Sequence, residues 1–104
     1  MSPVKLCCII KPFRVDAVID QIESLAGVEE VLVNEVRGYG RQKGHLDLYR
    51  GSEYDLTFLP KVYLEIFVSS REAAAKVSET LVQTARTGRI GDGKIFTIEV
   101  ERMV

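Results

Sequence analysis

The order in which hydrophobic periodicity changes along the sequence constrains this chain more than any other feature. Four stretches have the alternation or short apolar run that is typical of strands: 4–10, 28–36, 62–69 and 95–101. Apolar residues recur at helical spacing over 15–25 and 71–86, and Gly27 is placed to end the first helix. The sequence therefore predicts the order strand, helix, strand, strand, helix, strand.

This order is that of the ferredoxin-like fold, an α+β architecture written βαββαβ. The chain has 104 residues, of which 46% are hydrophobic. That length is enough for one such domain, covering 1–104, and too short for two. Two helices can cover only one face of a four-stranded sheet, so the other face must be polar or must find another cover.

Strand alternation assigns apolar residues to this second face: Cys7, Ile9, Leu32, Tyr63 and Phe67. Self-association is the simplest way to cover such a face, so we expect an oligomer. The alternative is a monomer whose twisted sheet leaves scattered apolar side chains exposed.

The segment between the second and third strands, residues 37–60, is far longer than the roughly two to five residues of an ordinary hairpin. It combines glycines and charged residues of both signs with three tyrosines, Tyr39, Tyr49 and Tyr54. Tyrosines on a polar loop are good interface anchors and accessible modification sites. We expect a functional loop, the alternative being an extended hairpin with no special task.

Residues 87–95 have the sequence TGRIGDGKI, in which Gly88, Gly93 and Lys94 fit most of the phosphate-loop pattern GxxxxGK[ST]. Ile95 replaces the hydroxyl residue of that pattern, and the segment runs from helix to strand, so a P-loop NTPase is excluded. Closely spaced glycines can still bring backbone N–H groups to an anion, with Lys94 adding charge. A helix C-cap followed by a tight turn explains the same glycines equally well.

A second glycine-rich stretch, GYGRQKG at 38–44, lacks the third glycine of GxGxxG and opens no predicted helix, which disfavours a dinucleotide-binding fold. Neither stretch contains a Ser/His/Asp set, a carboxylate pair or a thiolate–His pair. We therefore expect no enzymatic activity.

Composition excludes several other classes of protein. The formal net charge of −1 gives no reason to expect nucleic acid as a partner. Cys7 and Cys8 are adjacent and cannot pair in ordinary geometry, and with His45 as the single histidine they form no zinc pattern. We interpret both as small hydrophobic residues of a reducing compartment. No signal pattern or membrane-length apolar stretch is found, which predicts a cytoplasmic protein without membrane insertion.

Several segments resemble the signature motifs of the PII nitrogen-regulatory signal-transduction proteins. They are IIKPF at 9–13, GYGRQKGH at 38–45, LYRGSEY at 48–54, FLPK at 58–61 and TGRIGDGKIF at 87–96. The similarity extends over nearly the whole chain, and the longer motifs are highly specific. The resemblance implies a homotrimer of ferredoxin-like subunits, in agreement with the apolar second face.

The resemblance also implies a ligand site and favours anion binding by 87–95. ATP or ADP would bind in the clefts between subunits, on Gly38, Arg41, Gln42, Gly91, Asp92, Gly93 and Lys94. Next to the nucleotide, 2-oxoglutarate would bind beside a magnesium ion that bridges the phosphates. Gln42 would be a metal ligand, and Lys61 would pair with a carboxylate of the oxoacid.

Residues 37–55 would form the T-loop, with which the family binds targets such as ammonium transporters, biosynthetic enzymes and nucleotidyltransferase regulators. Tyr54 matches the tyrosine that is uridylylated in many bacterial members, and Ser52 matches a serine that is phosphorylated in some cyanobacterial ones. Either modification would add negative charge to a loop rich in arginine.

Three positions depart from the family pattern. Leu32 stands where many members have threonine, and Phe67 where a smaller aliphatic residue is common. The sequence stops at Val104, before an Arg-x-Arg pair that usually reaches the phosphates. Losing two such contacts, of roughly 1.5–3 kcal/mol each, would weaken ATP binding by about a hundredfold or more. The alternatives to a full sensor are a paralogue with a weakened nucleotide switch that acts as a binding module, and a slow ATP hydrolase.

Overall fold

In the part of the chain that the structure describes, four strands and two helices follow one another in the predicted order. The computed structural model describes residues 2–39, 59–85 and 93–104. Its elements are β1 (Val4–Ile10), the 3-10 turn η1 (Pro12–Arg14), α1 (Val15–Ile22), β2 (Val28–Gly38), β3 (Leu59–Val68), α3 (Arg71–Ala85) and β4 (Gly93–Glu99). No helix among the described residues is both long and apolar enough to cross a membrane.

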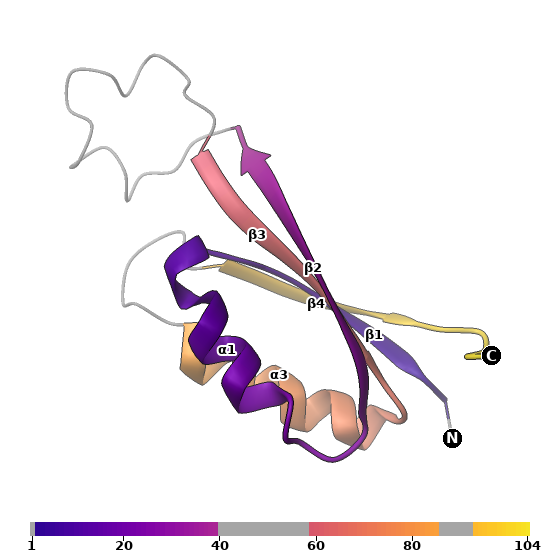
Figure 1. Cartoon of the computed structure of the whole chain (residues 1–104). Helices are drawn as coiled ribbons and strands as arrows, with labels where there is room; N and C mark the ends of the chain where they lie inside the picture. Colours follow the sequence, from indigo (N-terminus) through magenta and orange to yellow (C-terminus); the bar gives the residue numbers. More distant parts are fainter. Residues whose placement is uncertain (1, 40–58, 86–92) are drawn as a thin grey trace, which may run out of the picture.

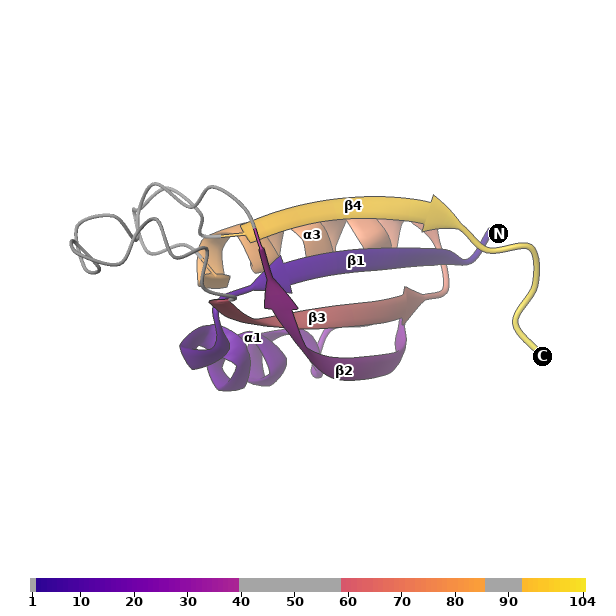
Figure 2. The same ribbon diagram turned by 90° about the horizontal axis from the view of Figure 1, so that it is seen from above.

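The strands form one antiparallel sheet in the order β2-β3-β1-β4, with both helices on the same side (Figure 1). β1 is central: Ile10 pairs with Val62 of β3 and with Gly93 of β4. Seen from above, the four strands lie side by side, and the termini lie at the end of the sheet opposite to the start of β3 and β4 (Figure 2). This arrangement confirms the predicted α+β fold of the ferredoxin-like type.

The core lies between the sheet and the two helices. Alternate residues of β1 point into it: Val4, Leu6, Cys8 and Ile10. From α3 it receives the predicted stripe of Ala74, Val77, Leu81 and Ala85, and from α1 it receives Val18 and Ile22. Each large aliphatic side chain buried in this way contributes roughly 1.5–3 kcal/mol relative to its exposed state. The apolar stripes of both helices match the apolar side chains on one face of the sheet, so the helices pack on that face.

Element boundaries differ from the predicted ones where pairing, rather than local sequence, decides them. β2 continues to Gly38 and β3 begins at Leu59, so both ends of the predicted 37–60 loop belong to strands. Pro60 is tolerated because β3 pairs only with β2 at that position. The other side of the strand forms no backbone hydrogen bonds there, so the missing N–H of proline breaks none. β4 ends at Glu99, two residues early, because its partner Val4 is the first residue of β1.

The face of the sheet away from the helices is largely apolar, as predicted. We call this surface the open face; it carries Cys7, Ile9, Leu32, Val36, Tyr63, Phe67, Phe96 and Ile98. Phe96 and Ile98 on β4 are 45% and 46% exposed, which is unusual for large apolar side chains in a strand. Its polar members include the half-buried ion pair between Lys5 Nζ and Glu65 Oε2, at 3.0 Å.

The turn after α1 depends on Gly27. Its φ of +89° lies in the left-handed region, and a Cβ built there would stand 2.7 Å from the Cβ of Ala73 at the start of α3. Its carbonyl also accepts a hydrogen bond from the Ser69 N–H at 2.9 Å. Gly27 thus holds the end of one helix against the beginning of the other.

We expect Gly27→Ala to lower the free energy of unfolding by about 1–3 kcal/mol, since the new methyl group adds both backbone strain and a clash with α3. Urea unfolding measures the change. Ala26→Ser, on the exposed neighbour, is the matched control and should stay within about 0.5 kcal/mol of the wild type. Equal stability of the Gly27 variant and the wild type would show that α3 does not pack as described.

Candidate functional site

One end of each of the four strands lies at the same end of the sheet. β1 and β2 end there, at Ile10 and Gly38, and β3 and β4 begin there, at Leu59 and Gly93 (Figure 2). The antiparallel topology therefore joins the two glycine-rich stretches of the sequence, 38–44 and 87–94, to the same end of the sheet. Local sequence alone does not show this meeting, because it depends on β1 lying between β3 and β4.

Three lysines gather at this end, and we call them the lysine cluster: Lys11, Lys61 and Lys94. Lys61 is the one charged residue among the described buried ones, with only 8% of its surface exposed. Burial lowers the pKa of Lys61, and the positive charges of Lys11 and Lys94 lower it further. A concentration of positive charge of this kind makes this end of the sheet electrostatically favourable for an anion.

Two glycines lie next to the lysine cluster. A Cβ at Gly38 would lie 3.4 Å from Lys61 Cγ, so the β2 backbone lies against the lysine stem. A Cβ at Gly93 would lie 2.5 Å from the carbonyl oxygen of Ile9, a distance that no side chain tolerates. Gly93 is therefore required for β4 to begin where it does, directly before Lys94.

Among the predicted site residues, the structure brings together Gly38, Lys61, Gly93 and Lys94. Sequence reasoning missed Lys11 as a member of the site. It follows β1 directly, and Ile10 pairs with both Val62 and Gly93. The signal that could have found it is the antiparallel topology, which places the residue after β1 beside the first residues of β3 and β4.

The remaining predicted site residues lie outside the described residues. They are Arg41 and Gln42 after β2, Ser52 and Tyr54 in the predicted T-loop, and Gly91 and Asp92 before β4. Their assignments stay predictions.

The thiols offer no alternative chemistry. Cys8 lies in the core, where burial raises its pKa to about 12, so it is not a nucleophile at neutral pH. Cys7 is buried on the open face, where its hydrogen bond with Tyr63 is the main cause that raises the pKa of that phenol to about 12. In the described part of the chain, His, Cys, Asp and Glu form no group of three that could hold a metal ion.

These features define a small α+β domain with a cationic, glycine-lined end that can receive an anion. Residues 4–104 match the family described as nitrogen regulatory protein P-II. The chain is 50% identical over 100 residues to the nitrogen regulatory protein P-II of Pasteurella multocida and 47% identical to P-II 1 of Escherichia coli K12, covering 96% of this chain and 88% of each relative. A crystal structure of Arabidopsis thaliana PII bound to citrate superposes with a TM-score of 0.74 at 31% identity, covering 95% of this chain and 78% of that one.

This chain belongs to the nitrogen regulatory protein P-II family. The resemblance inferred from the sequence motifs is thereby confirmed. Proteins of this family are named as regulators rather than enzymes, so a regulatory role at the level of the family follows for this chain.

The lowered pKa of Lys61 predicts a pH dependence of stability. In the unfolded chain the pKa takes its ordinary value of 10.5, so at pH values between the folded pKa and 10.5 the unfolded chain binds more protons. The free energy of unfolding therefore rises with pH in that window. Lys61→Met removes the titrating group, and urea unfolding between about pH 8 and about pH 10 should show a smaller rise in the variant than in the wild type.

Lys76→Met, on an exposed lysine of α3, is the control and should keep the rise seen in the wild type. An equal rise in the Lys61 variant would mean that this lysine is not held against its two neighbours.

Proposed function

We propose that this protein is a PII-type signal-transduction protein that senses ATP or ADP together with 2-oxoglutarate and regulates nitrogen and carbon metabolism by binding target proteins. The lysine cluster carries this proposal, because three cations beside backbone glycines give this end of the sheet a positive charge that suits an anionic ligand. Membership of the P-II family supplies the regulatory role.

The nucleotide phosphates fit the part of the site nearest to Gly93 and Lys94. An exposed ammonium group next to a glycine backbone suits a polyphosphate, which needs charge and close approach of N–H groups. Gly91 and Asp92 would extend this cradle, and Gly38, Arg41 and Gln42 would complete it from the end of β2.

The buried Lys61 suits a carboxylate better than a solvated phosphate tail. A charge-assisted hydrogen bond is stronger away from water, and Lys61 is nearly buried. We assign it to a carboxylate of 2-oxoglutarate. The citrate in the Arabidopsis relative is also a small polycarboxylate, which supports an organic acid as a ligand class.

Magnesium would be coordinated mainly by the bound nucleotide and oxoacid, and not by the described side chains. Lysines cannot ligate a cation, and no metal-ligating group of three is found among the described residues. Phosphate and carboxylate oxygens of the bound ligands would supply most of the coordination, with Gln42 as the protein ligand. The ion would reduce the repulsion between the polyphosphate and the oxoacid dianion.

The open face supports a homotrimer. Apolar side chains from all four strands lie on this face of the sheet, and neither α1 nor α3 covers it (Figure 1). Packing three copies through it would bury these side chains and place the lysine end of each sheet in a cleft between subunits. The protein would act in the cytoplasm, and the T-loop of residues 37–55 would reach ammonium transporters, biosynthetic enzymes or nucleotidyltransferase regulators.

Calorimetric titration tests the sensor. We expect 2-oxoglutarate to bind only when ATP and magnesium are present, and Lys61→Met to weaken oxoacid binding by about tenfold or more, the loss of one charge-assisted contact. Lys76→Met is the control and should bind like the wild type. Equal binding of 2-oxoglutarate with and without ATP would contradict the proposed order of binding.

Sedimentation velocity tests the oligomer. We expect a trimer for the wild type and dissociation for Ile98→Glu, because the new carboxylate would be buried in the interface. Val82→Glu is a matched control: Val82 is 45% exposed, nearly as much as Ile98, but lies on α3. A monomeric wild type, or two variants that behave alike, would show that the open face is not the interface.

A further inference from the structure

A pair of opposite charges lies within the open face. Lys5 Nζ donates a hydrogen bond to Glu65 Oε2 at 3.0 Å and joins β1 to β3, the two inner strands of the sheet. Only 24% and 20% of the two side-chain surfaces are exposed. Lysine and glutamate on a surface strand are mostly exposed, so the surrounding sheet already shields this pair from water to a large extent.

Apolar side chains flank the pair on the same face. Strand register places Lys5 between Phe67 of β3 and Ile98 of β4, and it places Glu65 beside Leu32 of β2. Ile98 is 46% exposed and Leu32 is 39% exposed. Any partner that covered these apolar side chains would therefore cover the ion pair together with them.

Covering the face would remove water from the pair. An ammonium group has three donors and a carboxylate can accept several hydrogen bonds, and the 3.0 Å contact uses one donor and one acceptor. Contact between apolar side chains is non-directional, so these side chains alone would let two faces meet in several registers. The pair disfavours each register that leaves its other donors and acceptors unsatisfied, because such groups are costly once buried.

A second copy of this chain fits such a face better than a purely apolar partner does. Each copy brings a cation and an anion side by side, so the face is complementary to itself in charge. In a closed ring the same residues of every copy lie around one axis. The Lys5 of one copy can then donate to the Glu65 of the next, in addition to the bond within the chain.

We propose that Lys5 and Glu65 determine the specificity of self-association: their ion pair selects the one arrangement of open faces in which its other donors and acceptors find partners in the next copy. This inference rests on the proposed function for the existence of the trimer. It goes beyond that proposal by naming the residues that select the arrangement.

Sedimentation velocity of the full chain over a range of concentrations tests the pair. Glu65→Gln leaves the Lys5 cation without its anion in the interface and should weaken association by about tenfold or more. The reversed pair, Lys5→Glu with Glu65→Lys, restores both charges and should restore the trimer. The apolar pair, Lys5→Met with Glu65→Leu, should associate at least as strongly as the wild type but in more than one stoichiometry.

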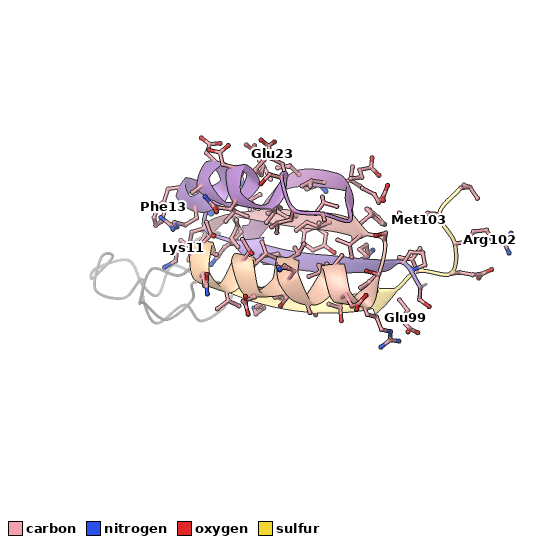
Figure 3. The ribbon with its side chains drawn as sticks, turned by 90° about the horizontal axis from the view of Figure 1, so that it is seen from below. Lys11, Phe13, Glu23, Glu99, Arg102 and Met103 are labelled. Atoms are coloured by element: carbon pink, nitrogen blue, oxygen red, sulfur yellow. The ribbon has the colours of Figure 1, made fainter. Side chains whose placement is uncertain are left out.

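The matched control is a second ion pair, on the other side of the sheet. Glu99 at the end of β4 pairs with Arg71 at the start of α3, and both side chains are exposed (Figure 3). Glu99→Gln makes the same chemical change as Glu65→Gln and should leave association unchanged. Circular dichroism checks that each variant is folded, and the reversed pair keeps the test decisive if Glu65→Gln is not.

The outcomes separate this inference from the proposed trimer. Unchanged association of Glu65→Gln, a reversed pair that does not assemble, or a single stoichiometry for the apolar pair would each overturn the role of Lys5 and Glu65 while leaving the trimer in place. A monomeric wild type would contradict the trimer itself, and this inference with it.

Discussion

The pairing of β1 with β3 on one side and β4 on the other is the interaction on which the rest of the structure depends. It places the core residues of β1 under both helices and ends the strand between the first residues of its two neighbours. Lys11 therefore emerges beside Lys61 and Lys94, which lie more than thirty residues from each other in the sequence. Without this pairing the lysine cluster would not exist, and the glycine-rich stretches would have no common end of the sheet to attach to.

The lysine cluster and the open face both depend on what packs against the sheet. A sheet with two helices has one covered face, and this chain leaves its second face apolar where a monomer would make it polar. We propose that the charged cluster at the end of the sheet lines a cleft when another copy packs alongside. In the proposed trimer, association would therefore complete the site as well as cover the apolar surface, so that ligand binding and assembly would support each other.

Sequence periodicity was sufficient to predict the strands and helices and which of their side chains face the core. Leu6 and Cys8 follow the period of a strand, and Val77 and Leu81 follow that of a helix. Periodicity did not predict the strand boundaries that depend on pairing. β2 extends to Gly38 and β3 begins at Leu59 because each strand supplies the other's hydrogen bonds. Gly38, Lys61, Gly93 and Lys94 were assigned through motifs, and the structure places them at one end of the sheet. The place of Lys11 and the ion pair between Lys5 and Glu65 depend on tertiary topology, across 60 residues in the second case, and no local pattern encodes them.

We propose that the anionic ligand binds at the lysine cluster. NMR of lysine side chains during titration with ATP and magnesium tests it most directly, because each ammonium group reports its own surroundings. We expect the signals of Lys11, Lys61 and Lys94 to shift together, while those of Lys5 on the open face and Lys76 on α3 stay in place. Binding that shifts Lys5 or Lys76 and leaves the cluster unchanged would contradict it.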